Sequence, residues 1–324
     1  MPFYKYEFQN NTQQFSNTYP VKLPGSGNDG GKIGGQIQGQ FYPHGPNRFK
    51  RGHNIPAQSK RVGFLDHPSG YLDLVIDGSQ YCGIEAPKAP GKGVSVRQAI
   101  IPIEWFNAYF LPWQNGFIAR MDLPVVGNVQ YFFTGEMNGC AFLVAGNPNR
   151  PMVAHLNIEE PMNTGPNWHQ QRQQELEFQI RLALQGKNRA NAKILTKWGP
   201  ARNTLNFEGR LIRYGPTYDR NQLEETTAIQ SFDNLLLNKN KKILPNSRNN
   251  IIADIKCSMM GIKQGGAWRF FYQRVIEVYA SGIVKKLNSK WKGFKKKIGG
   301  DHRVRERNSA RIIIPGSGYN QFWP

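Results

Sequence analysis

Cysteine is scarce in this chain, with three residues in 324, and the scarcity excludes a fold that depends on a disulfide framework. Cys82, Cys140 and Cys257 are too far apart for a zinc motif, since the sequence holds no CxxC or HxxxH pair. The glycine-rich loops also lack the GxxxxGK[ST] pattern of a nucleotide site. We therefore expect a protein whose thiols stay reduced, as in cytosol, and which uses no metal and no other cofactor.

Long apolar runs are absent as well. No stretch of about 18 apolar residues occurs, so the sequence predicts no membrane-spanning helix. The first eight residues, MPFYKYEF, lack the apolar centre of a secretory signal. If the protein leaves its cell, we expect it to use another export route.

Acidic residues are few, with 22 Asp and Glu against 42 Lys and Arg, which gives a formal net charge of +20. Such a charge predicts attraction to acidic partners. The densest basic stretch is 285–311, where Trp291 and Phe294 are interleaved with Lys and Arg. Its interpretation stays open between binding to an anionic inner leaflet, binding to nucleic acid and a solvated face. We favour the leaflet or an acidic partner and expect no nucleic acid, because no RNP, KH, zinc-finger or helix-turn-helix signature occurs.

Residues 1–60 are rich in Gly, Asn, Gln and Pro and poor in apolar residues. A segment of this composition buries too little surface to offset its ordering entropy. We expect a disordered leader over 1–60 that contacts a delivery apparatus, with a loosely packed N-terminal arm as the alternative. Residues 61–324 are then expected to form a single domain that ends in the basic stretch 285–311.

Short β-prone runs separated by Gly, Pro and Asn begin near residue 62. A Gly-Gly turn at 263–267 predicts a hairpin between two long arms, 251–262 and 268–279. Composition predicts a helix over 167–183, although apolar residues alternate in its second half with the period of a strand. Many strands and few helices predict an α+β fold with a central mixed β-sandwich flanked by helices. The other predicted strands are 72–76, 96–103, 117–120, 129–133, 141–145, 152–157, 192–197 and 209–213.

The segment Thr134-Gly-Glu-Met-Asn-Gly-Cys140, followed by His155, carries the chemistry. Cys140 follows a glycine at the start of one predicted strand, and His155 lies on the next, so an antiparallel hairpin places both on adjacent strands. A histidine beside a cysteine takes up the thiol proton and gives a thiolate–imidazolium pair, which is a nucleophile with its own acid and base. Thr134 is the nearest group to orient the imidazole. The alternative is a buried structural cysteine with an unrelated histidine.

The same residues resemble the catalytic segment of the cytotoxic-necrotizing-factor family of glutamine deamidases. In that family a Gly-Cys turn carries the nucleophile and a histidine follows downstream, so Thr134, Cys140 and His155 fall on matching positions. The family's Leu-Ser-Gly-Cys is Met137-Asn-Gly-Cys140 here. The resemblance is specific over 134–155 and thin over the rest of 60–285.

This resemblance implies a bacterial toxin or effector, secreted or injected, that acts in the host cell cytoplasm or at the inner membrane leaflet. It implies that residues 61–324 are a catalytic domain that deamidates a switch II glutamine of Rho-family GTPases, of Rho and Rac types, and so locks them active. An amine in place of water gives transglutamination. The sequence does not distinguish deamidation or transglutamination from proteolysis, because Cys140 and His155 would serve all three reactions. A non-enzymatic basic protein that binds nucleic acid or membranes is the alternative from another class.

Overall fold

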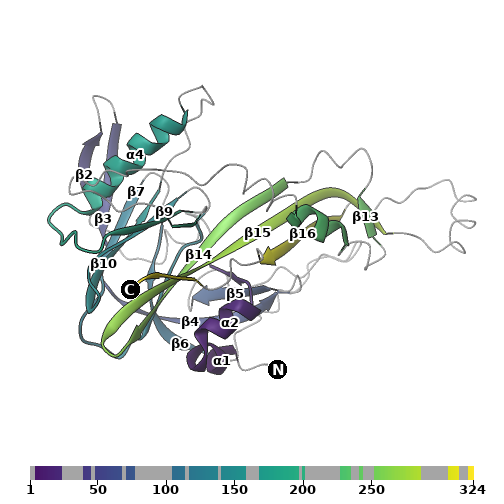
Figure 1. Ribbon diagram of the computed structural model, residues 1–324, viewed down its shortest axis with the longest axis horizontal. Helices are drawn as coiled ribbons and strands as arrows, with labels where there is room; N and C mark the ends of the chain where they lie inside the picture. Colours follow the sequence, from purple (N-terminus) through teal and green to yellow (C-terminus); the bar gives the residue numbers. More distant parts are fainter. Residues whose placement is uncertain are drawn as a thin grey trace, which may run out of the picture.

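The computed structural model describes residues 4–23, 39–44, 48–67, 71–76, 104–113, 117–137, 140–157, 168–196, 199–200, 227–234, 241–243, 252–285, 306–313 and 320–324. Within these ranges the chain is mixed α+β, rich in strands and poor in helices (Figure 1). The predicted strands at 96–103 and 209–213, Cys82 and most of the basic stretch 285–311 lie outside the described residues.

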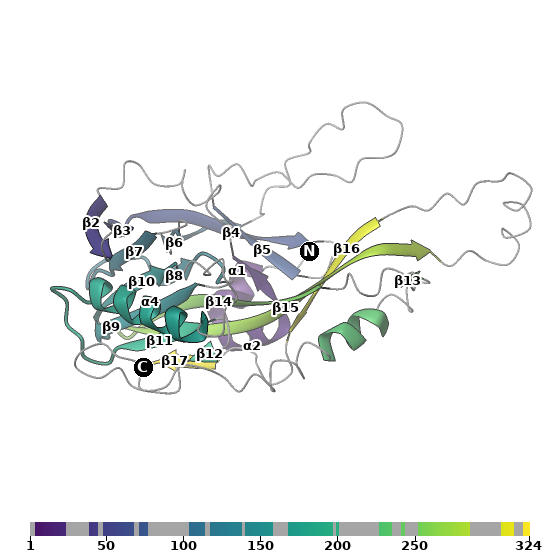
Figure 2. The ribbon, with the colours of Figure 1, turned by 90° about the horizontal axis from the view of Figure 1, so that it is seen from above.

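The larger of the two sheets has ten strands among the described residues. Its main path runs β1-β5-β4-β6-β8-β14-β15-β13, and β16 and β17 also pair with β15. The predicted hairpin is confirmed, since β14 and β15 pair antiparallel around Gly265 and Gly266, both with positive φ. The far end of β15 projects beyond most of the sheet together with β16 (Figure 2), and β13 pairs with this end. The strands are β1 Val21–Lys22, β4 Ser59–His67, β5 Tyr71–Ile76, β6 Phe106–Leu111, β8 Tyr131–Thr134, β13 Lys241–Ile243, β14 Ile252–Gln264, β15 Ala267–Lys285, β16 Glu306–Ile313 and β17 Asn320–Trp323.

The smaller sheet has seven described strands in the order β12-β11-β9-β10-β7-β3-β2. Its centre is the antiparallel hairpin of β9 and β10, which the β-prone runs at 141–145 and 152–157 predicted. The strands are β2 Gly39–His44, β3 Arg48–Asn54, β7 Phe117–Asp122, β9 Ala141–Asn147, β10 Arg150–Leu156, β11 Lys193–Thr196 and β12 Gly199–Pro200.

Helix α4, Trp168–Ala183, covers one face of the smaller sheet. Leu176, Ile180 and Leu184 are spaced four residues apart, and they pack on Leu143 and Leu156 of the sheet. This spacing is helical, so the helix predicted over 167–183 is confirmed and a strand in its second half is excluded. No helix among the described residues is long and apolar enough to cross a membrane.

The N-terminal segment, residues 4–23, is folded rather than disordered, and residues 39–44, 48–54 and 59–60 belong to strands β2, β3 and β4. Both findings correct the expected disordered leader over these parts of 1–60. Residues 4–23 form α1, Tyr4–Asn10, α2, Thr12–Thr18, and strand β1. Phe8 and Phe15 pack with Phe64 and Phe133 in one apolar cluster on the larger sheet. In Figure 1 α1 and α2 lie at the opposite side of the strands from α4. Aromatic side chains therefore supply the buried surface that the composition of 1–60 as a whole lacks.

Two buried polar side chains of the central hairpin hold this segment in place. Gln273 accepts a hydrogen bond from the backbone N–H of Val21 at 2.9 Å and donates to the carbonyls of Tyr19, at 3.0 Å, and Ser16. Ser258 donates to the carbonyl of Val21 at 2.9 Å. Because these groups are buried, each hydrogen bond that is lost leaves a polar atom unpaired at a cost of about 1–3 kcal/mol.

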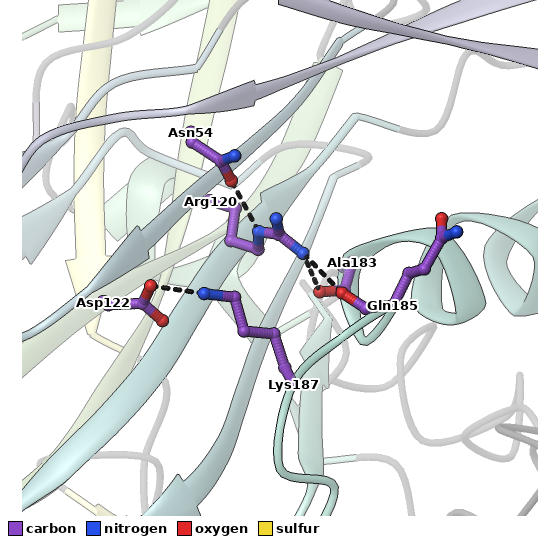
Figure 3. Close-up of polar contacts among 6 residues, drawn as sticks. All are labelled: Asn54, Arg120, Asp122, Ala183, Gln185 and Lys187. Carbon is purple, nitrogen blue, oxygen red and sulfur yellow. Dashed lines mark hydrogen bonds and ion pairs between the residues drawn. The ribbon is translucent and has the colours of Figure 1, made fainter.

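The end of α4 is fixed to the smaller sheet by Arg120 of β7 (Figure 3). Its Nη1 donates to the carbonyls of Ala183 and Gln185 at 3.0 and 3.1 Å, and its Nε donates to Asn54 at 2.7 Å. The last carbonyls of a helix have no intrahelical partner and carry partial negative charge. A cation at this point therefore fixes the helix against β7, which is the strand next to β10.

A third apolar cluster takes residues from both sheets. From the larger sheet it includes Phe132 and Phe270, and from the smaller sheet Phe142, Val144 and Val153. Alternate residues of β9 belong to this cluster and to the cluster under α4, as the period of a strand requires. The candidate site residues lie on the side of the smaller sheet that faces this shared cluster.

Candidate active site

Strands β9 and β10 set Cys140 and His155 on one face of the smaller sheet. His155 is directly opposite Phe142, so their side chains share a face. Cys140 precedes Phe142 by two residues and belongs to the same apolar cluster. It is therefore a diagonal neighbour of His155 across the hairpin, a position within reach of side-chain interaction.

Thr134 reaches His155 from the larger sheet. It ends β8, two residues after Phe132, and both side chains turn toward the smaller sheet. The Oγ1 of Thr134 lies 2.8 Å from Nδ1 of His155 and 2.9 Å from the carbonyl oxygen of Leu111. A hydrogen bond thus links the two sheets at the imidazole.

These two contacts fix the position of the proton on the imidazole. A carbonyl oxygen only accepts, so the Thr134 hydroxyl donates its single hydrogen to Leu111. The hydroxyl oxygen then accepts from His155, whose Nδ1 carries the ring hydrogen. The other nitrogen, Nε2, keeps its lone pair and is buried, with no hydrogen-bond partner in the described part of the chain.

His155 is neutral in the folded protein. It is 1% exposed, and burial lowers its pKa from 6.5 to about 3 because the charged form loses its hydration. This corrects the expectation of an imidazolium already formed beside Cys140. The neutral ring is instead a proton acceptor, as a general base must be before reaction.

The structure contains no hydrogen bond between Cys140 and Nε2 of His155. The Cys140 thiol is buried, 6% exposed, and is not part of a disulfide. Nε2 of His155 accepts no hydrogen bond from it or from any other described residue. Catalytic hydrogen bonds are commonly long before substrate binds. The structure therefore contains the hydrogen bond between Thr134 and His155, whereas the hydrogen bond between Cys140 and Nε2 has yet to form.

Trp113 is a member of this group that the sequence did not indicate. Its indole stacks on the His155 ring, with ring centroids 6.0 Å apart and an angle of 19° between the planes. Gly135 makes room for it, since a Cβ at that position would lie 2.1 Å from Cδ1 of Trp113. Only the parallel pairing of Leu111 with Thr134 places Trp113 beside Gly135, and no local motif encodes that register.

Charged side chains are also buried near the site. Glu136 lies 3.3 Å from the ammonium of Lys256, and Arg274 is 6% exposed. The pKa of the Cys257 thiol is raised to about 12. Burial is the largest cause, Arg274 acts in the opposite direction, and Glu136 adds to the rise. Cys257 is therefore protonated at neutral pH and is not a thiolate nucleophile.

No protein-family model matches the sequence, and a search of curated proteins finds no match. Within the described ranges no group of three or more His, Cys, Asp or Glu side chains is placed to hold a metal ion.

The burial of His155 has a measurable effect on stability. Below pH 6.5 the unfolded chain takes up a proton on this ring, whereas the folded protein does so only near pH 3. The free energy of unfolding is therefore expected to fall with acid over this window, by at most about 1.4 kcal/mol per pH unit from this residue. In urea titrations at several pH values, the stability difference between the wild type and His155→Gln should narrow from about pH 7 to 5. A constant difference would show that the ring titrates normally.

Proposed function

We propose that this protein is an effector enzyme, a glutamine deamidase that works through Cys140, His155 and Thr134. The observation that carries the proposal is the hydrogen bond from Nδ1 of His155 to Thr134, which leaves a buried Nε2 as proton acceptor. This acceptor is on the strand adjacent to Cys140 and on the same face. A base with a fixed tautomer beside a thiol is the minimal arrangement for nucleophilic catalysis by cysteine.

The proposed reaction exchanges an amide for an acid. Nε2 of His155 takes the thiol proton as the sulfur of Cys140 bonds to the carboxamide carbon, and the carbonyl oxygen becomes negative. The carbon–nitrogen bond then breaks, and the protonated imidazole gives its proton to the leaving nitrogen, which departs as ammonia. Water, deprotonated by the same ring, then bonds to the thioester carbon. The carbon–sulfur bond breaks, the ring returns its proton to the sulfur of Cys140, and the product is a glutamate side chain. An amine in place of water gives transglutamination.

The proposal extends to the fold around this site. The two sheets pack face to face as a β-sandwich flanked by helices, with the Cys–His pair on adjacent strands of one sheet. Support comes from the apolar cluster shared by both sheets and from the clusters beneath α4 and beneath α1 and α2. A site between two sheets holds its groups on rigid elements, which favours a fixed reaction geometry.

For the substrate, we propose a switch II glutamine of a host Rho-family GTPase of Rho or Rac type. The support is the resemblance over 134–155 together with the net charge of +20. The basic stretch 285–311 is proposed to hold the enzyme near the anionic inner leaflet, in the host cytoplasm to which the protein is secreted or injected. Contact with a delivery apparatus is proposed for 1–60, and residues 61–324 carry the catalytic site.

The test is deamidation of a purified Rho-type GTPase by the wild type, Cys140→Ala and Cys257→Ala. We expect a gain of about one dalton at a switch glutamine with the wild type and Cys257→Ala, and none with Cys140→Ala. Cys257 is a matched control because it is also a buried cysteine of the same apolar cluster. Deamidation by Cys140→Ala would refute the proposed nucleophile. Absence of modification on every Rho-type protein would refute the substrate. Salt-sensitive binding with an inert Cys140 would support the non-enzymatic alternative.

A further inference from the structure

Two buried ring nitrogens at the candidate site have no hydrogen-bond partner in the described part of the chain. They are Nε2 of His155 and Nε1 of Trp113. Their rings stack on each other with an angle of 19° between the planes. Nine-tenths or more of buried polar groups are paired in native proteins, and an unpaired one costs about 1–3 kcal/mol. Two such atoms on neighbouring rings indicate a functional use.

The two nitrogens differ in what they offer to a ligand. An indole N–H only donates, whereas Nε2 of His155, with the ring hydrogen on Nδ1, only accepts. Attack by Cys140 on a carboxamide requires both. The thiol proton needs an acceptor, and the carbonyl oxygen, which becomes negative, needs a donor.

We propose that the indole N–H of Trp113 donates a hydrogen bond to the oxygen of the carboxamide that Cys140 attacks. The inference rests on the proposed deamidase function and adds the group that stabilises the oxyanion. As sulfur bonds to carbon, the π electron pair moves to oxygen, and the hydrogen bond from the indole strengthens. When ammonia leaves, the carbonyl reforms and the hydrogen bond weakens again. A donor already placed in a buried site costs no reorganisation during the reaction.

The backbone holds the nitrogen-bearing edge of the indole beside the site. A Cβ on Gly135 would lie 2.1 Å from Cδ1 and 2.9 Å from Nε1 of Trp113, so this edge rests against the residue that follows Thr134. Trp113 is half-buried, whereas Thr134, Cys140 and His155 are buried. Trp113 is therefore the most exposed of these four residues.

Trp268 provides a matched control. It is a buried tryptophan whose Nε1 also has no partner among the described residues. Trp268 pairs with Lys263 of β14. The part of β14 nearest the site is Cys257, which bridges to Met137 and is six positions from Lys263. Phenylalanine at position 113 or 268 keeps an aromatic ring and removes one unpaired N–H, and only the N–H of Trp113 lies on a ring stacked on His155.

The experiment measures kcat and KM for deamidation of a purified Rho-type GTPase by wild type, Trp113→Phe and Trp268→Phe. We expect kcat to fall by roughly 10²–10³ for Trp113→Phe with KM little changed, as for loss of an oxyanion donor, and to stay unchanged for Trp268→Phe. Circular dichroism checks that each variant is folded. A kcat for Trp113→Phe close to the wild-type value, in an active and folded protein, would overturn the inference.

A second measurement separates this inference from the proposed function. The probe is a glutamine analogue in which a chloromethyl ketone replaces the side-chain amide, and mass spectrometry follows the rate of its attachment to Cys140. The ketone oxygen needs the same donor, so Trp113→Phe should slow attachment and Trp268→Phe should not. Slowed attachment without any deamidation by the wild type would refute the proposed function and keep the donor. Equal attachment rates would overturn the donor.

Discussion

Replacing Phe8 with alanine is expected to lower the free energy of unfolding by about 3–5 kcal/mol, the cost of truncating a buried phenylalanine. The Phe8 side chain is fully buried. Five aromatic rings surround it at centroid distances between 5.1 and 5.9 Å, namely Phe15, Phe64, Phe106, Tyr131 and Phe133. Neighbours from several strands cannot collapse together into the space that the ring leaves. The measurement is urea unfolding followed by tryptophan fluorescence.

Tyr6→Ala is the matched control, because Tyr6 is on the same helix and 67% exposed. A loss of less than about 0.5 kcal/mol is expected there, as for surface positions in general. Equal stability of Phe8→Ala and wild type would contradict the packing of the N-terminal segment on the larger sheet.

The packing of residues 4–23 also constrains the proposed delivery role of 1–60. Removal of this segment would expose the apolar face formed by Phe64, Phe106, Tyr131 and Phe133. It would also leave Gln273 and Ser258 without their backbone partners. Large exposed apolar patches promote aggregation. Any cleavage that accompanies delivery is therefore expected to spare residues 4–23.

Local sequence patterns predicted the helices and strands that have a clear local signal. The hairpin of β14 and β15 follows from a Gly-Gly turn between β-prone arms, and α4 from its helix-forming composition. The average composition of residues 1–60 does not indicate the N-terminal helices. Tyr4 and Phe8 are four positions apart, as are Phe15 and Tyr19, a helical spacing. Averaging with the glycine-rich residues that follow concealed this short signal.

The candidate site shows the same division between local and long-range information. A short loop between two β-prone runs was enough to predict the hairpin of β9 and β10, which carries His155 and begins directly after Cys140. Two features depend on contacts far apart in the sequence. Trp113 meets His155 only through the parallel pairing of β6 with β8. The lowered pKa of His155 comes from burial between elements of both sheets, which no single segment reveals.

The Thr134→Val substitution is expected to lower kcat/KM for deamidation by roughly 10²–10⁴, the range for loss of a fixed histidine tautomer and its proton transfer. Valine nearly keeps the shape of threonine but removes the hydroxyl, so Nδ1 of His155 loses its acceptor. With no acceptor beside Nδ1, nothing favours the ring hydrogen at that position, and we expect it on Nε2. In that tautomer Nε2 cannot take the proton of Cys140. Thr134→Ser, which keeps the hydroxyl, should retain most of the activity.

The tautomer can be read without any substrate, by ¹⁵N NMR of the imidazole. In the wild type and Thr134→Ser we expect the hydrogen on Nδ1, because the hydroxyl that donates to Leu111 can only accept from the ring. In Thr134→Val we expect it on Nε2. A hydrogen on Nε2 in the wild type would contradict the role of His155 as base. The expected shift together with full activity of Thr134→Val would show that the enzyme does not use this base, and the proposed mechanism would fail at its first proton transfer.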